Sequence, residues 1–193
     1  MLKRRVALAA LIVAVSVSTL ASGLGASGSR KLPSRLTDQE FWNLIGDLSE
    51  PGGTFRSDNL LSNEGRFQFI IPDLIEAAKP GGVYMGVGPE QNFTYIAATR
   101  PAIAFIVDIR RGNLDLHLMY KALFELSADR ADFVSRLFSR KRPQGLRPAS
   151  TAAEMFAAFL QAVPSDALYE RNLKDIQHQL VALHGLALGA EDL

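Results

Sequence analysis

The stretch that decides the fold is residues 83–111, which read VYMGVGPEQNFTYIAATRPAIAFIVDIRR. Residues 83–87 are a short apolar run, and residues 102–109 are a second run that is rich in β-branched side chains. Short apolar runs bounded by glycine and proline are typical of buried parallel strands. Residues 92–99 between them are long enough for two helical turns. The stretch therefore predicts a βαβ unit with Asp108 near the carboxyl end of its second strand.

The glycine turn at residues 86–90 is the clearest sign of chemistry. Glycines at the end of a parallel strand let the backbone approach a ligand, and the helix that follows presents unpaired amides that suit an anionic or polar group. An acid about 20 residues further on can accept hydrogen bonds from ribose hydroxyls, and Asp108 has that spacing from Gly86. The dinucleotide pattern has glycine where this chain has Gln91, and a run of three glycines at alternate positions would have one where this chain has Glu90. A second interpretation therefore stays open, a tight turn in which Asp108 caps the next helix.

Two arginines follow Asp108 directly, and their guanidinium groups can pair with Asp108 or Glu90 or bind a ligand phosphate or carboxylate. No catalytic residue is predicted. The candidate binding residues are Gly86, Gly88, Pro89, Glu90, Gln91, Asp108 and Arg110.

Helices are expected on both sides of the βαβ unit, because apolar residues recur there at helical spacing. Thr37 and Glu40 form a capping box for the first helix. Asn113 and Ser127 are the expected N-caps of two later helices, and residues 150–154 offer a capping arrangement for a third. No third strand is evident after Asp108. The expected helices span residues 37–49, 66–79, 113–127, 129–140, 150–163 and 166–188.

Residues 54–64 form a polar loop that is unusually rich in Arg, Asp, Asn, Ser and Glu for a simple connection. One interpretation is a ligand-facing loop that folds over the glycine turn. The other is an ordered surface loop held by Asx and Ser turns.

The composition is that of a globular protein, with 193 residues of which 48% are hydrophobic and 21% charged. A net charge of +1 gives no reason to expect nucleic acid, which favours a small-molecule or protein partner. The absence of cysteine excludes disulfides, thiolate zinc sites and a cysteine nucleophile. His117, His178 and His184 lack a second ligand at the spacing of a zinc helix, so no metal is expected. Basic residues between positions 136 and 147 are interpreted as a solvated loop, with contact to anionic lipid or a partner as the alternative.

The first residues have the pattern of a secretory signal. Lys3, Arg4 and Arg5 precede an uncharged segment, residues 6–24, whose strongest apolar core has the length of a signal-peptide h-region. Residues 1–26 are therefore predicted to be a cleaved signal peptide or an uncleaved signal anchor, and residues 27–36 a linker. Both alternatives export the protein to the periplasm or cell envelope, or anchor it in the inner membrane through residues 6–24.

Residues 83–89, followed by residues 104–108, resemble the first two conserved segments of class I S-adenosylmethionine-dependent methyltransferases. The sequence is also similar to a group of uncharacterised bacterial proteins with methyltransferase-like, Rossmann-like folds, of which the chain resembles an N-terminal or truncated version. The resemblance implies S-adenosylmethionine as cofactor, with Gly86, Gly88 and the following amides near its methionine part and Asp108 on its ribose. The family has an acid where this chain has Tyr84.

Together these observations predict an α/β protein with a partial Rossmann-like βαβ core, flanking helices and a helix-rich C-terminal half. The domain is expected to span residues 37–193 and to be incomplete as a doubly wound sheet. The leading functional hypothesis is a methyltransferase-like protein with a nucleotide-cofactor site. The alternative is a non-catalytic exported or membrane-anchored envelope protein, or a truncated remnant, that acts through protein interaction.

Overall fold

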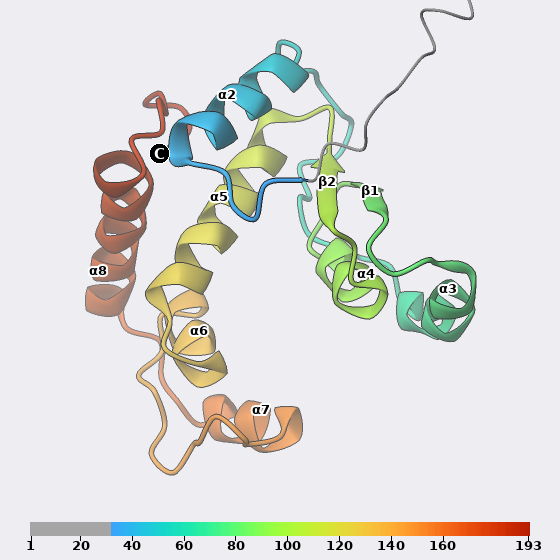
Figure 1. Cartoon of the computed structure of the whole chain (residues 1–193). Helices are drawn as coiled ribbons and strands as arrows, with labels where there is room; N and C mark the ends of the chain where they lie inside the picture. Colours follow the sequence, from blue (N-terminus) through green and yellow to red (C-terminus); the bar gives the residue numbers. More distant parts are fainter. Residues whose placement is uncertain (1–31) are drawn as a thin grey trace, which may run out of the picture. The chain divides into compact units, whose positions relative to one another are not determined.

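The computed structural model describes residues 32–193, and residues 36–193 form one compact unit (Figure 1). The predicted signal or anchor segment, residues 1–26 with its apolar run at 6–24, lies outside the described residues. From residue 32 onward, no helix has both the length and the apolar character needed to cross a membrane.

The centre of the predicted unit is confirmed. Strands β1 (Val83–Val87) and β2 (Ile103–Val107) are parallel, and α4 (Gln91–Thr99) connects them. The register pairs Val83 with Ile103 and Val87 with Val107. Within residues 32–193 these two strands are the whole sheet, so the structure is a mixed helix and sheet protein with one small parallel sheet.

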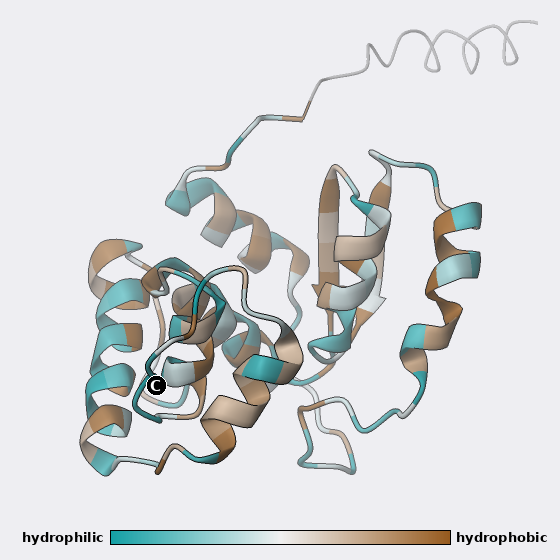
Figure 2. Ribbon diagram, turned by 90° about the horizontal axis from the view of Figure 1, so that it is seen from below, coloured by the Kyte–Doolittle hydropathy of each residue, from teal (hydrophilic) through white to brown (hydrophobic). Residues whose placement is uncertain are grey.

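The two faces of this sheet have different surroundings. On the inner face Tyr84 and Gly86 are partly covered, and β1 contacts α4. On the outer face Val83, Met85 and Val87 are 64%, 74% and 71% exposed, and Val107 is 49% exposed. Figure 2 shows the hydrophobic colour of both strands. Since parallel strands are normally covered on both faces, this apolar outer face is unusual.

The elements before the sheet begin as their sequence predicts. Helix α2 (Asp38–Leu48) starts with the expected capping box, in which Thr37 and Glu40 bond each other's backbone amides. The helix expected at residues 66–79 is divided into a 3-10 turn, η1 (Phe67–Ile70), and α3 (Ile71–Ala77), with proline in the first turn of α3.

The C-terminal half is helical, as predicted. It contains α5 (Arg111–Leu126), α6 (Arg130–Leu137), α7 (Ala152–Leu160), α8 (Asp166–Gln177) and the π-helical segment η2 (His178–Leu183). The helix expected at residues 166–188 is thus an α-helix that widens into π-helical turns and ends earlier.

Two of the predicted N-caps are wrong. Asn113 is a buried residue inside α5, which starts earlier because Asp108 already accepts a hydrogen bond from the Arg110 backbone amide. Ser127 ends α5 by donating to the Leu123 carbonyl, and Asp129 caps α6 instead. The capping arrangement at residues 150–154 is confirmed, with Thr151 as the N-cap of α7.

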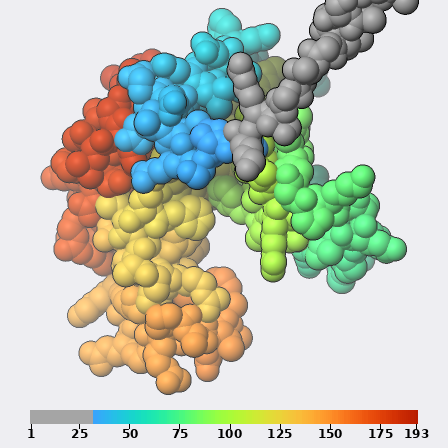
Figure 3. All heavy atoms as spheres, viewed as in Figure 1, coloured from blue at the N-terminus to red at the C-terminus, as the bar shows by residue number. Residues whose placement is uncertain are grey.

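The main apolar core lies between α5 and the C-terminal segment. Its buried members are Leu118, Ala122, Leu180 and Leu186, and aromatic residues of α2 pack against it. Figure 3 shows α2 in contact with α5 and with the end of the chain. A second, smaller cluster joins α6 and α7. Both cores therefore lie in the helical part, and the main core holds α5, whose N-terminus follows β2.

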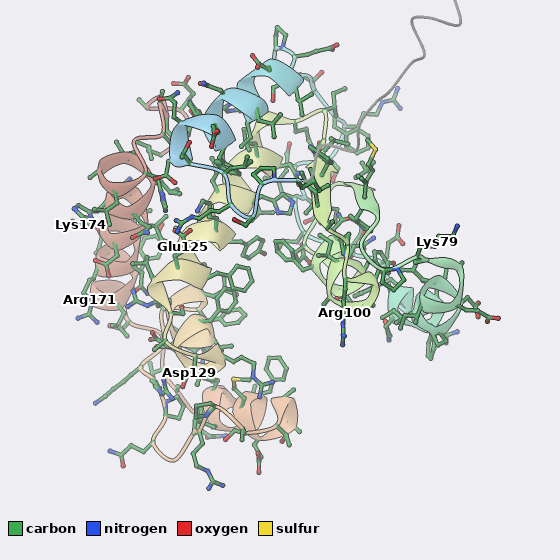
Figure 4. The ribbon with its side chains drawn as sticks, in the orientation of Figure 1. Lys79, Arg100, Glu125, Asp129, Arg171 and Lys174 are labelled. Carbon is green, nitrogen blue, oxygen red and sulfur yellow. The ribbon has the colours of Figure 1, made fainter. Side chains whose placement is uncertain are left out.

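A polar bridge ties the same elements together. The His184 ring lies between two carboxylates, with Nδ1 2.9 Å from Asp38 Oδ1 and Nε2 2.6 Å from Glu125 Oε2. Burial alone would raise the pKa of Glu125, but hydrogen bonds from Lys121, His184 and Gln179 lower it to about 2. Figure 4 labels Glu125 on α5. This bridge fixes the start of α2 against α5.

Candidate functional site

The candidate site lies where β1 and β2 end on the same edge of the sheet. Gly88 follows β1 with a left-handed backbone, φ 78°, and its amide donates to the Val107 carbonyl at 2.9 Å. A Cβ atom at Gly88 would stand 3.6 Å from Asp108 Oδ2. The structure therefore brings together the glycine turn and the acid that the sequence singles out. Lys79 and Arg100, labelled in Figure 4, precede the strands and belong to the opposite edge.

Neighbouring side chains fill the space beside the Cα atom of Gly86. A Cβ atom there would stand 1.9 Å from Asn92 Oδ1 and 2.8 Å from the Tyr84 ring. The Tyr84 hydroxyl donates to Asn92 Oδ1 at 2.6 Å, and burial raises the pKa of Tyr84, which keeps this hydroxyl protonated. The glycine is required for this internal packing, so the space beside it is not open to a ligand.

Asn92 is a residue that the sequence interpretation missed. Its side chain is 3% exposed, and its amide donates to the carbonyls of Val87 and Pro89 at 3.1 and 2.7 Å. It therefore fixes the glycine turn from the first residues of α4. A buried polar residue two positions after Glu90 could have been suspected from its place in the first helical turn.

Asp108 is paired with Arg110 in a two-point contact. Arg110 Nε donates to Oδ1 and Nη2 donates to Oδ2, both at 3.0 Å. The Arg110 backbone amide also donates to Oδ1 at 2.8 Å, which is an Asx turn before α5. The N-cap of α5 is Arg110 and no side chain caps this helix, so the interpretation of Asp108 as a helix cap is wrong. Side-chain hydrogen bonds from Arg110 hold the pKa of Asp108 below its usual range, against the effect of burial. Asp108 is therefore an ionised acceptor whose two oxygens both have a partner.

Arg110 also holds the polar loop. We call residues 53–62 the covering loop. Arg110 Nη1 donates to the carbonyls of Ser57 and Asn59 at 3.2 and 2.9 Å. The ring of Phe55 lies over the guanidinium group, 5.3 Å from its central carbon, in a cation–π contact. One side chain thus connects the acid at the end of β2 to the loop.

The far end of the covering loop is held by the other candidate residues. The Ser62 amide donates to both carboxylate oxygens of Glu90 at 3.2 Å, and the Ser62 hydroxyl donates to Gln91 Oε1. At the near end the Gly53 amide donates to the Ile109 carbonyl at 2.7 Å. The loop therefore spans the edge of the sheet and is anchored on both sides of it.

The covering loop also has internal turns, as one of the two sequence interpretations expected. The Asn59 amide donates to Ser57 Oγ, and the Leu61 amide donates to Asn59 Oδ1 at 3.0 Å. These bonds make an ordered loop, while its contacts with Arg110 and Glu90 place it next to the glycine turn.

Two polar side chains of α5 complete the edge. His117 Nε2 donates to the Gly88 carbonyl at 2.9 Å, and the ring packs edge-on against Phe93. Asn113, one helical turn earlier on the same face, is 2% exposed. Asn113 Oδ1 and His117 Nδ1 are buried without a hydrogen-bond partner in the protein. The sequence interpretation assigned neither residue to the site, and their i, i+4 spacing was the available signal.

Arg111 pairs with neither Asp108 nor Glu90, which was one of the two roles that the sequence left open for it. It donates to both oxygens of Asp192 at 2.9 and 3.0 Å and so attaches the end of the described chain to α5. Asp115 lies beside this pair, and burial together with the Asp192 charge raises its pKa to about 6. The two consecutive arginines thus serve two different contacts.

Two of the basic residues between α6 and α7, Arg140 and Arg142, bind within the protein. Arg142 forms a two-point pair with Asp129 at 2.8 and 2.7 Å, and Arg140 donates to carbonyls at the end of α7. Among residues 32–193 no group of histidine and carboxylate side chains has the arrangement of a metal site.

Comparisons with known proteins give one family and no named relative. No curated protein matches the chain. The family is described as "Domain of unknown function (DUF7790)", and the match covers residues 60–182, which include β1, α4, β2 and α5 through α8. Because this match covers more than half of the 193 residues, the chain belongs to the DUF7790 family.

Proposed function

We propose that this domain binds a nucleotide cofactor of the S-adenosylmethionine type at the carboxyl edge of β1 and β2, in a partial Rossmann-like core. The observation that carries the proposal is Gly88, whose left-handed turn stands next to the Asp108 carboxylate. Ligands of α/β proteins bind outside the carboxyl ends of parallel strands, where glycine turns and strand-end acids meet.

The residues present fit such a cofactor in part. An ionised Asp108 is suited to accept hydrogen bonds from ribose hydroxyls, and the amides after Gly88 at the start of α4 are suited to a carboxylate. When bound, S-adenosylmethionine supplies an electrophilic methyl group. Tyr84 stands where class I S-adenosylmethionine-dependent methyltransferases have an acid, and it is bonded to Asn92. We therefore propose binding and assign no catalytic residue.

Isothermal titration calorimetry tests this proposal. The full chain is titrated with S-adenosylmethionine and S-adenosylhomocysteine, and the Asp108→Ala variant with the same ligands. We expect heat of binding with the wild-type chain that is lost in the variant, because the ribose acceptor is removed. Absence of heat with both ligands in the wild-type chain would contradict the proposal.

A second candidate function is supported by the apolar outer face of the sheet. We propose that this face joins two copies of the chain, as in a non-catalytic protein that acts through association. Val83, Met85, Val87 and Val107 are all at least 49% exposed on it. At roughly 100 Å² for each of these four side chains and its neighbours, two copies would bury about 800 Å², which is the size of a weak or transient contact. An identical face on each copy suits a twofold contact, since aligned sheets pack face to face.

Sedimentation equilibrium tests the second candidate. Met85→Lys places a charge in the middle of the face and should convert a dimer to a monomer. Leu160→Lys is the matched control, because Leu160 is 78% exposed on α7, away from the sheet. A wild-type chain that is monomeric at every concentration would overturn this candidate. If both variants dissociate the dimer, the outer face of the sheet is not the specific contact between the copies. The predicted export or inner-membrane anchoring through residues 6–24 is compatible with such an envelope protein and stays a proposal.

A further inference from the structure

We propose that Arg110 is a gate that keeps the cofactor site closed, so that a ligand must displace its guanidinium group from Asp108 and release the covering loop. The inference rests on the proposed function and concerns the regulation of the same site. Arg110 is a positioning residue here, since it acts through Asp108 and the loop.

The first step is competition for one carboxylate. Ribose hydroxyls need the oxygens of Asp108 as acceptors, and both oxygens already accept from the Arg110 guanidinium at 3.0 Å. The Asp108 side chain is 7% exposed and that of Arg110 is 17% exposed, so solvent weakens the pair little. A ribose can therefore reach this acceptor with normal geometry only after the guanidinium has moved.

The second step is the mechanical connection to the loop. The Arg110 Nη1 atom that faces away from Asp108 donates to the Ser57 and Asn59 carbonyls, and Phe55 packs on the guanidinium. Moving Arg110 thus breaks the contacts in the middle of the covering loop at the same moment as it frees Asp108. Release of the Asp108 carboxylate from Arg110 and release of the covering loop are therefore one event.

The third step concerns the glycine turn. The side chains of Glu90 and Gln91, at the start of α4, already accept hydrogen bonds from Ser62 of the same loop. The ribose acceptor and the residues beside the glycine turn are therefore closed by a single segment. Because the covering loop is short and partly exposed, its opening costs little compared with global unfolding.

The thermodynamic consequence is a lowered apparent affinity. When only a fraction of molecules is open, the measured dissociation constant exceeds the intrinsic one by the inverse of that fraction. Removing the Arg110 guanidinium raises the fraction of molecules in which the site is open. Arg110→Ala is therefore expected to bind S-adenosylhomocysteine about tenfold more tightly than wild type. A residue with only a structural role would give the opposite sign, because its loss weakens a site.

The experiment measures loop opening and binding separately. Hydrogen exchange of the amides in residues 53–62 reports the loop without any ligand, and calorimetry with S-adenosylhomocysteine reports binding, both on the full chain. Arg111→Ala is the matched control, because this neighbouring arginine pairs with Asp192 and Asp115, whereas Arg110 donates to the loop. Phe55→Ala, at a side chain that is 62% exposed, weakens the contact between Arg110 and the loop and leaves Asp108 unchanged. This second variant keeps the test valid if Arg110→Ala misfolds.

We expect faster exchange in the loop and tighter binding for Arg110→Ala, a smaller change of the same sign for Phe55→Ala, and neither change for Arg111→Ala. Faster exchange with unchanged or weaker binding would overturn the gate while leaving the cofactor site in place. Faster exchange with no heat in any variant would refute the proposed function, and the gate with it. Unchanged exchange in both Arg110→Ala and Phe55→Ala would show that Arg110 does not hold the loop.

Discussion

The sheet half of the domain, residues 53–110, and the helical half, residues 111–193, are held together by different forces. Every buried hydrophobic side chain of the described chain lies in the helical half. In the sheet half the buried residues are Gly88 and Asn92, and its loop is held by hydrogen bonds of Arg110 and Glu90. Apolar burial gives the larger share of folding free energy, so stability belongs to the helical half. The sheet half is the part that can open locally, as a ligand site requires.

The largest expected effect tests where the stability lies. Leu118→Ala removes a side chain that is 3% exposed in the main core and should lower the free energy of unfolding by about 2–5 kcal/mol. Val87→Ala, at a side chain that is 71% exposed on the sheet of the single chain, is the control and should change the free energy of unfolding of the monomer by less than about 0.5 kcal/mol. Urea unfolding followed by circular dichroism measures both. Equal losses would mean that the sheet face is covered in solution.

A smaller effect is expected from Gly86→Ala in the sheet half. The new methyl group would meet Asn92 Oδ1 and the Tyr84 ring at sub-contact distances, and such overpacking costs about 1–3 kcal/mol. Gly46→Ala in α2 is the matched control, because no atom lies within 4 Å of its added Cβ. There we expect a gain of about 0.5–1 kcal/mol from helix propensity. If the same urea titration shows Gly86→Ala to be neutral, the packing of Tyr84 and Asn92 against Gly86 is wrong.

Much of the fold could be predicted because its signals are local. The two short apolar runs at residues 83–87 and 102–109 give the strands, and the Thr37–Glu40 pair gives the start of α2. The caps at Asn113 and Ser127 failed because tertiary and neighbouring groups decided them, Asp108 in one case and Asp129 in the other. Cap preferences alone do not take into account hydrogen bonds from a side chain at the end of the preceding strand.

The position of the candidate site could be predicted, but the hydrogen bonds that its residues already make within the protein could not. The spacing from Gly86 to Asp108 placed the glycine turn and the acid on one edge. The pairing of Arg110 with Asp108 is local and was one of the options that the sequence offered. That Arg110 would reach Ser57, and that Ser62 would reach Glu90, depends on contacts between segments 53 and 28 positions apart in the chain. No local pattern records such pairings. Asn92 was missed although its partners are local, since its side chain bonds the carbonyls of Val87 and Pro89 in the preceding turn.

The smallest effect is a pH dependence that distinguishes two carboxylates of α5. The pKa of Asp115 is raised to about 6, so the stability that it contributes is complete below pH 4 and is lost as the pH rises through 6. The pKa of Glu125 is lowered to about 2, so its contribution is present above pH 4.5 and is lost as the pH falls toward 2. Asp115→Asn should therefore gain stability relative to wild type between pH 5 and 7, and Glu125→Gln should lose it there.

Thermal unfolding across pH 3 to 8 measures these differences. Removal of the Asp115 charge also relieves its repulsion with Asp192, which is why the gain should grow toward neutral pH. A stability difference between Asp115→Asn and wild type that does not change with pH would show that Asp115 titrates normally.

The most direct test of the central claim is hydrogen exchange of the full chain with and without saturating S-adenosylhomocysteine. The account predicts that the ligand speeds exchange of the amides in the covering loop, residues 53–62, because it displaces Arg110 from Asp108. It also predicts slower exchange at the start of α4 and no change in the core helices α5 and α8. An unchanged loop, or a loop that becomes more protected when the ligand binds, would contradict the claim that this edge of the sheet is a nucleotide site closed by Arg110.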